Sequence, residues 1–140
     1  MNRRYIILLG LFLVTSMGIV NALEVTKVTC EMMVDPLAVV SGQPRFGWQM
    51  KASENGAMQS AYEVEVYKLQ NGQRVTVWES GKVASSQSQL VSYKGETLQS
   101  GAKYLWRVKV WDERNKPSEW SKEGIFRLAP DTSCLDAEWI

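Results

Sequence analysis

The stretch Tyr104-Leu-Trp-Arg-Val-Lys-Val-Trp111 alternates large apolar side chains with charged or mixed ones. Successive side chains of a β-strand point to opposite faces, so this alternation predicts a strand with one buried face. The side chains expected in the core are Tyr104, Trp106, Val108 and Val110, and those expected at a surface are Leu105, Arg107, Lys109 and Trp111. The stretch is therefore predicted to be the central strand of a β-sandwich.

Six further segments with strand character lie around this stretch, and turn signals separate them. They cover residues 24–33, 45–50, 61–67, 75–78, 90–93 and 120–128. The first is expected to be an edge strand, and the second carries Trp48 into the core. Asn71-Gly72 predicts a tight hairpin because both residues tolerate positive φ. Seven short strands without a helical period predict an all-β, seven-stranded antiparallel β-sandwich that is immunoglobulin-like or fibronectin type III-like.

Two local features refine this prediction. Leu98 precedes Tyr104 by six residues, a spacing typical of a tyrosine corner, in which the phenol bonds to backbone near the preceding loop. Gly124 is a candidate β-bulge in the last strand. In the segment 61–67 we expect Tyr62, Val64 and Val66 to face inward and Glu63, Glu65 and Tyr67 to face outward.

The first residues carry the features of an export signal. Arg3 and Arg4 precede an apolar run over residues 5–20, and Val20-Asn21-Ala22 suits signal peptidase. We therefore expect a signal peptide at 1–22, the sandwich at 23–130, and the start of a linker or next domain at 131–140. The alternative is an uncleaved anchor, but polar and small residues leave the run short of the roughly 18–20 apolar residues that a span needs. The predicted location is periplasmic or secreted, with the membrane met only through the signal peptide.

The net charge bears on nucleic-acid binding, and the two cysteines raise the question of a disulfide. The net charge of +1 provides no basic stripe, so we expect no nucleic-acid partner. Cys30 and Cys134 leave two alternatives open. A disulfide between them would close a loop of about 100 residues, worth up to ~4.7 kcal/mol; otherwise Cys30 is a small buried hydrophobe and Cys134 an exposed thiol.

The residue content argues against chemistry by this chain alone. It has no histidine, which excludes Ser-His-Asp and Cys-His arrangements and removes a usual zinc ligand. We expect no catalytic residue, no metal site and no cofactor. Glu63 and Glu65 lie two apart on a strand, about 7 Å along one face, a spacing compatible with an inverting glycosidase pair. Both are expected on a solvated face without a cleft, which argues against that role.

Aromatic residues form the remaining functional candidates. The candidate surface-contact residues are Arg107, Trp111, Trp120 and Trp78. Trp111 shares a face with Arg107 and Lys109, and Trp120 could stack on their side chains as a cation–π ladder. The ladder, packing against another domain, and stacking of a sugar on an exposed ring are the alternatives. We favour the first two.

Together, several motifs resemble the amino-terminal module of bacterial α-L-rhamnosidases. They are Asp35-Pro-Leu37, Pro44-Arg-Phe-Gly-Trp-Gln-Met50, Gln59-Ser-Ala-Tyr62, Trp78-Glu-Ser-Gly-Lys-Val83 with Gln87-Ser88, Tyr93-x-Gly95, Tyr104-x-Trp-Arg-Val-x-Val-Trp-Asp112, Ser118-x-Trp-Ser121 and Ala137-Glu-Trp-Ile140. Three positions depart from the family. Ala38, where the family has glycine, is an exchange of small residues on a loop. Gly47, where the family has serine, is expected at an exposed strand position. Asn115, where the family often has glycine, tolerates a left-handed turn.

The resemblance implies a fibronectin type III-like module that lies before an (α/α)₆-barrel, and the barrel would carry the acid and base carboxylates. No residue of this chain aligns with those carboxylates. We therefore expect a non-catalytic accessory module whose partners are downstream or separately encoded glycosidase domains. The alternative is an independent periplasmic module that binds protein or carbohydrate, with rhamnose-containing glycans as ligands.

Overall fold

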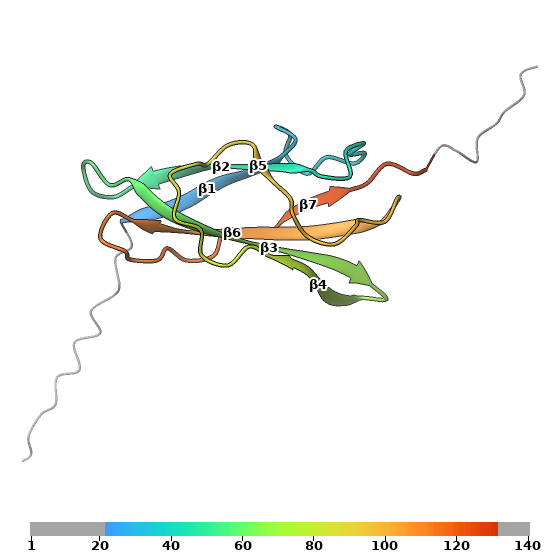
Figure 1. Cartoon of the computed structure of the whole chain (residues 1–140). Coiled ribbons are helices and arrows are strands. Elements are labelled where there is room, and N and C mark those ends of the chain that lie inside the picture. The colour runs from blue at the N-terminus through green and yellow to red at the C-terminus, as the bar shows by residue number, and fades with distance from the viewer. Residues whose placement is uncertain (1–21, 132–140) are drawn as a thin grey trace, which may run out of the picture.

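The computed structural model describes residues 22–131, which form two antiparallel β-sheets packed face to face (Figure 1). One sheet has the order β1–β2–β5, with β1 at Leu23–Cys30, β2 at Arg45–Ala52 and β5 at Val91–Ser92. The other has the order β4–β3–β6–β7, with β3 at Gln59–Gln70, β4 at Gln73–Glu79, β6 at Lys103–Asp112 and β7 at Gly124–Arg127. The described residues thus contain seven strands, and the predicted sandwich is confirmed.

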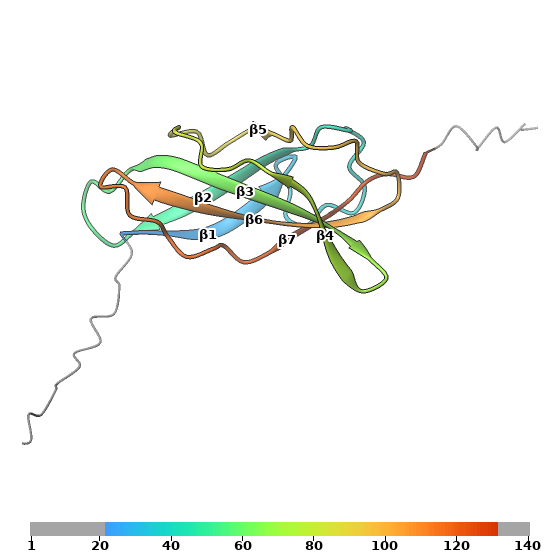
Figure 2. The ribbon, with the colours of Figure 1, turned by 60° about the horizontal axis from the view of Figure 1, so that its bottom comes forward.

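The place of β4 identifies the type of sandwich. In a constant-type immunoglobulin domain the fourth strand joins the sheet of the first two. Here β4 pairs with β3 through a two-residue hairpin, in which Asn71 and Gly72 have φ of 51° and 75°. This order is the fibronectin type III arrangement. β6 lies between β3 and β7, as the turned view in Figure 2 also shows, so the predicted central strand is confirmed.

The core consists of aromatic and β-branched side chains from both sheets. The inward residues of β6 are all buried, as predicted. The Phe46 ring of β2 lies 4.4 Å from the Trp106 ring, and the Trp48 ring lies 5.3 Å from that of Tyr62, between ring centres. Each such side chain, when fully buried, stabilises the fold by roughly 1.5–3 kcal/mol. These contacts join the two sheets.

The tyrosine corner is confirmed, and it ties β6 to the loop before it. The backbone N–H of Gln99 donates a hydrogen bond of 2.8 Å to the Tyr104 hydroxyl. Leu98 is buried next to this bond. Asn115 has a φ of 62°, as expected of a residue at a left-handed turn.

Leu105 is buried although the alternation predicted it at the surface, with an exposed fraction of only 6%. Its neighbours on the outer face are Tyr67 of β3 and Ile125 of β7, which lie opposite it in the two ladders. Both are large and half-buried. A cross-strand row of three apolar side chains therefore covers this part of the outer face.

The segment between β4 and β5 has no strand of its own and is held by side-chain amides. Trp48 Nε1 donates to Gln59 Oε1 at 2.9 Å, and Gln59 Nε2 donates to the carbonyls of Ser85 and Gln87 at 3.0 and 2.8 Å. Gln89 Nε2 donates to the Trp48 carbonyl at 3.2 Å. The side chains of Gln59 and Gln89 thus attach this segment to β2 and the core, and the Gln87 side chain bonds within the segment, to the carbonyls of Gln89 and Leu90.

The last strand is shorter than predicted: β7 begins at Gly124, not at residue 120. Before β7, Ser118 and Ser121 bond to β6 through their side chains as well as their backbone. The N–H groups of Val110 and Val108 donate to the hydroxyls of Ser118 and Ser121 at 3.1 and 3.0 Å. The N–H groups of the two serines donate to the Val110 and Val108 carbonyls at 2.7 and 2.8 Å. Serine hydroxyls therefore replace the backbone carbonyls of a regular strand.

Two predictions about glycines were wrong. Gly124 lies opposite Trp106 in a β6–β7 register without a shift, so it is not a bulge. A Cβ at this position would lie 2.5 Å from Trp106 Nε1, so the absence of a side chain permits close packing. Gly47 is buried instead of exposed, and a Cβ there would lie 2.7 Å from Gln89 Oε1.

The edge strand β1 is confirmed at the edge of its sheet, but it ends at Cys30 and not at residue 33. Glu31 and Met32 have φ of 49° and 64°, which turns the chain back so that Cys30 pairs with Met33. The predicted strand at 90–93 is only Val91–Ser92.

Several predictions lie outside the described residues, namely the signal peptide, the Cys30–Cys134 pairing and the motif at 137–140. Within residues 22–131 no helix is long and apolar enough to cross a membrane.

Candidate contact surface on the four-stranded sheet

The outward side chains of β6 form a row with rings from neighbouring segments. The guanidinium carbon of Arg107 lies 4.2 Å from the Trp120 ring centre. Lys109 Nζ lies 4.7 Å from the Trp120 ring and 5.3 Å from the Trp111 ring. Lys82 Nζ lies 4.9 Å from the Trp111 ring. We call Lys82, Trp111, Lys109, Trp120 and Arg107 the cation–aromatic row.

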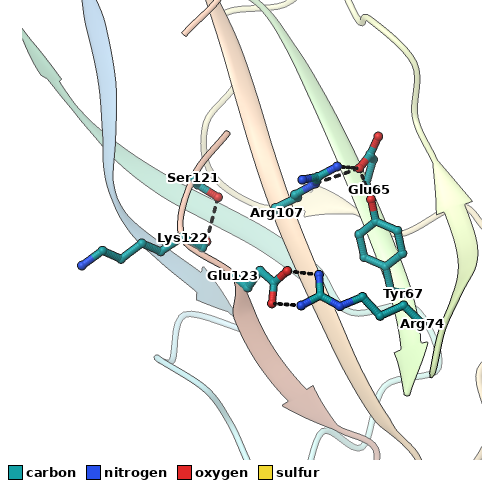
Figure 3. A network of polar contacts seen from close by, with 7 residues as sticks. All are labelled: Glu65, Tyr67, Arg74, Arg107, Ser121, Lys122 and Glu123. Carbon is teal, nitrogen blue, oxygen red and sulfur yellow. Dashed lines mark hydrogen bonds and ion pairs between the residues drawn. The ribbon is translucent and has the colours of Figure 1, made fainter. Parts of the chain in front are cut away.

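One end of the row continues into β3 through an ion pair (Figure 3). Arg107 contacts Glu65 Oε2 through Nη2 at 2.7 Å and through Nε at 2.8 Å. The Tyr67 hydroxyl donates to the same carboxylate oxygen. Burial, followed by the hydrogen bond to Glu65, raises the pKa of Tyr67. The phenol therefore remains a proton donor at neutral pH.

The expectation that Glu65 is solvated was wrong, because its side chain is only 12% exposed. The guanidinium and the phenol both contact Oε2 of this carboxylate. Glu63 lies opposite Lys109 in the β3–β6 ladder. The two glutamates thus sit among cations of the sheet face, and this surrounding supports a structural role for the pair.

A second ion pair borders the row and joins β4 to the residue before β7. Arg74 contacts Glu123 through both terminal nitrogens, one of them at 3.0 Å, as Figure 3 shows. The two partners lie 49 residues apart in the sequence. This pair therefore links the two edges of the four-stranded sheet on its outer face.

The contacts of the row are intramolecular. Arg107, Lys109 and Lys82 each face at least one ring of the row. Each exposed cation–π contact stabilises the fold by about 0.5–1 kcal/mol. The geometry is that of the expected ladder. Whether Arg107, Trp111 and Trp120 also contact a partner stays a prediction.

Trp78 lies apart from the other three candidate residues. It sits opposite Val66 in the β3–β4 ladder, and its ring centre lies 5.2 Å from that of Tyr93. The half-buried indole forms part of the wall of a groove of about 370 Å³, which we call the Trp78 groove. Other residues that line this groove include Tyr62, Ser80, Gln87, Ser92 and Lys94. Arg107, Trp111 and Trp120 are therefore brought together by the structure, and Trp78 is not.

A larger groove of about 650 Å³ runs between the β1 edge and the segment before β7. Its lining includes Val25, Lys27, Glu119, Trp120 and Lys122. Charged residues of both signs line it, together with Trp120. Within residues 22–131 no group of three or more Cys, Asp or Glu side chains is placed to hold a metal ion.

An apolar loop between β1 and β2 was missed at the sequence level. Its exposed residues are Met32, Met33, Val34, Leu37 and Val40, with exposed fractions of 51–89%. The available signal was an apolar run that continues past the strand into Asp35-Pro-Leu37. A run of this kind in a turn is unusual, because apolar side chains are normally placed in the core.

Comparison with known proteins gives a consistent result. The model of the Rha78A-like, N-terminal immunoglobulin domain matches residues 25–130. An α-L-rhamnosidase of Streptomyces avermitilis is 41% identical over 122 residues, which are 86% of this chain and 12% of that protein. One from Formosa agariphila is 37% identical over 125 residues, or 86% of this chain and 13% of that protein.

Structural similarity agrees with these matches. The crystal structure of the Streptomyces avermitilis α-L-rhamnosidase complexed with L-rhamnose superposes with a TM-score of 0.71 and 38% identity, over 77% of this chain and 11% of that one. This chain thus spans about an eighth of the length of its curated relatives. The matched part is their amino-terminal, non-catalytic immunoglobulin-like domain. The chain belongs to the family of Rha78A-like N-terminal immunoglobulin domains.

Proposed function

We propose that this module supports a glycosidase domain that acts on L-rhamnosides, without supplying catalytic residues itself. The observation that carries the proposal is the match of residues 25–130 to the amino-terminal domain of α-L-rhamnosidases. The glycosidase domain would lie downstream in the same polypeptide or in a separate chain. In this role the module stabilises the larger protein.

The chemistry of the outer face is consistent with a supporting role. The carboxylate of Glu65 is engaged by Arg107 and Tyr67, and Lys109 lies over the Trp111 and Trp120 rings. A glycosidase pair needs one carboxyl group held neutral, usually by an apolar pocket. Glu63 and Glu65 instead share their sheet face with Lys109 and Arg107.

A domain exchange tests this proposal. Residues 23–131 of this chain would replace the aligned segment of the Streptomyces avermitilis α-L-rhamnosidase. We expect the exchanged enzyme to hydrolyse a chromogenic α-L-rhamnoside and to survive heating several-fold longer than the same enzyme with the segment deleted. An unrelated fibronectin type III domain of similar length is the control. An exchange no better than deletion would argue against the proposal.

The proposed location is the periplasm or the exterior of the cell. The support is the run at residues 5–20 after Arg3 and Arg4, followed by small residues up to Ala22. The measurement is the amino-terminal sequence of the protein recovered from periplasmic extract or medium. Export predicts a chain that begins at Leu23, whereas an intact amino terminus in the membrane fraction would support an anchor.

A second candidate function, carbohydrate binding, is favoured by the Trp78 groove alone. Trp78 lines this groove together with Ser80, Gln87 and Lys94, whose side chains carry hydroxyl, amide and ammonium groups. Titration calorimetry of the 140-residue chain with rhamnose-containing oligosaccharides tests it. Saturable binding that Trp78→Phe weakens, and that Trp120→Phe leaves intact, would support this function. Heat of dilution alone would exclude these glycans as ligands.

A further inference from the structure

The apolar loop, defined as residues 31–40 between β1 and β2, concentrates the exposed hydrophobic surface of the module. Among residues 22–131 it contains five of the eight large hydrophobic side chains that are exposed. Leu37 and Val40 are the most exposed, at 82% and 89%. Scattered single hydrophobic residues are normal on a surface, whereas a contiguous group marks an interaction site.

The loop is held in place by several polar contacts. Glu31 accepts bonds from the backbone N–H of Arg45 at 2.6 Å and from its guanidinium at 2.9 Å. Asp35 Oδ1 accepts a bond from the N–H of Ile125 at 2.9 Å. Glu31, Met32 and Asp35 all have positive φ, a conformation that costs free energy in such residues. A fixed, locally strained backbone therefore presents the apolar side chains to solvent.

The loop lies at the end of the sandwich where β7 ends and the chain leaves the domain (Figure 1). The N–H of Val39 donates to the Arg127 carbonyl at 2.8 Å, and the N–H of Ala129 donates to the Val39 carbonyl at 2.8 Å. The N–H of Arg127 donates to the Pro36 carbonyl at 3.1 Å. The last described residues therefore lie beside the apolar loop, and a domain that follows in the same polypeptide would meet the loop at a high effective concentration.

We propose that the apolar loop is the docking face for the domain that follows this module in an α-L-rhamnosidase-type polypeptide. The inference rests on the proposed function and adds the surface that carries it. The partner face must be apolar, and Met32 and Met33 can adapt to it because their side chains are flexible. Relatives about eight times longer than the matched segment have the chain length for such a partner.

The charge of the loop favours a protein partner over a lipid surface. Its charged residues are Glu31 and Asp35, and residues 31–40 contain no lysine or arginine. Arg45, five residues after the loop, is paired with Glu31. An anionic membrane attracts basic clusters and repels acidic ones, so the loop is unsuited to it.

The test compares two double variants in the domain exchange described above. The loop variant is Leu37→Gln with Val40→Asn. The control variant is Met58→Gln with Val75→Thr, which alters two exposed hydrophobic residues elsewhere on the module. Because all four side chains are exposed, we expect both variants of the free 140-residue chain to melt within a few degrees of the unsubstituted chain.

In the exchanged enzyme the two variants should differ. We expect the loop variant to shorten the heat-inactivation half-life several-fold, and the control variant to leave it unchanged. Amide hydrogen exchange over residues 31–40 should also be slower in the exchanged enzyme than in the free chain. Half-lives that are equal in the loop variant and the control variant would overturn the docking proposal.

Other outcomes separate this inference from the function on which it rests. If the exchanged enzyme without substitutions is no more stable to heat than the enzyme with the segment deleted, the proposed function is overturned, and the docking proposal with it. If the exchanged enzyme is stable and the loop variant does not change its heat-inactivation half-life, only the docking proposal is overturned. Sedimentation of the free chain as a dimer that the loop variant dissociates would assign the loop to a second copy. Binding to anionic vesicles that the same variant abolishes would assign it to a membrane.

Discussion

At the scale of single residues, Cys30 shows how burial controls reactivity. It is 1% exposed, and burial, with a smaller effect of the Glu31 charge, raises the pKa of its thiol to about 12. Only the thiolate attacks an alkylating reagent. We expect Cys30 in a Cys134→Ser variant to resist iodoacetamide at neutral pH and to react fully in urea, as measured by mass spectrometry. Rapid alkylation without denaturant would contradict the buried position.

Glu31 predicts a pH dependence of stability. The side-chain hydrogen bond from Arg45 is the largest of the effects that lower the pKa of Glu31 from its usual value of 4.5. A carboxyl group with a lowered folded pKa stabilises the fold above its unfolded pKa, and the contribution is lost as the pH falls through the folded pKa.

The Glu31→Gln variant tests this dependence. We expect it to unfold at slightly lower urea than the unsubstituted chain at neutral pH, and at equal urea once the pH lies below the folded pKa of Glu31. The effect is small because Arg45 is about half exposed and water screens the pair. A difference between the two chains that persists in acid would contradict this assignment.

Single residues also show the limits of prediction from sequence. The inward side chains of β6 followed from alternation alone, since the strand period assigns each to a face. The burial of Leu105 and Glu65 did not follow. It depends on Tyr67, Ile125 and Arg107 in neighbouring strands, and a register between strands cannot be read from one strand.

At the scale of elements, the segment before β7 uses serine hydroxyls to complete the sheet. The buried N–H of Val110 has the Ser118 hydroxyl as its acceptor. We expect Ser118→Ala to lower the free energy of unfolding by about 1–3 kcal/mol, because the N–H would be left without a partner. Urea denaturation measures the effect. Ser41→Ala, which removes an exposed hydroxyl, is the control, and equal losses in the two variants would contradict the role of Ser118.

Elements were predicted well where a backbone pattern defines them. Asn71-Gly72 predicted the β3–β4 hairpin because the turn requires positive φ at both positions. The extent of β7 and the segment at 85–89 were not predicted. Part of their hydrogen bonding comes from the Ser121, Gln59 and Gln89 side chains, and side-chain bonds have no sequence period.

At the scale of the whole molecule, two surfaces differ in character. The outer face of the four-stranded sheet is filled by the cation–aromatic row, whose groups contact one another. The apolar loop, by contrast, presents side chains that are exposed to solvent, and it lies beside the residues that follow β7. Arg107, Lys109, Trp111 and Trp120 of the row were predictable from the alternation of β6 and the Ser118-x-Trp-Ser121 motif, and Lys82 was not. The loop was not, because its position depends on how Val39 and Asp35 pair with residues 125–129.

The central claim is that the outer face stabilises the module and is not a sugar platform, and Arg107→Ala tests it most directly. Loss of Arg107 leaves Glu65, 12% exposed, without its ionic partner and removes the contact with Trp120. Melting of the 140-residue chain, followed by calorimetry with and without rhamnose-containing oligosaccharide, is the measurement. We expect a loss of about 1–3 kcal/mol, or roughly 5–15 °C in melting temperature, and any oligosaccharide-dependent shift to be equal in the two chains. An unchanged melting temperature with a large loss of oligosaccharide affinity would contradict the account.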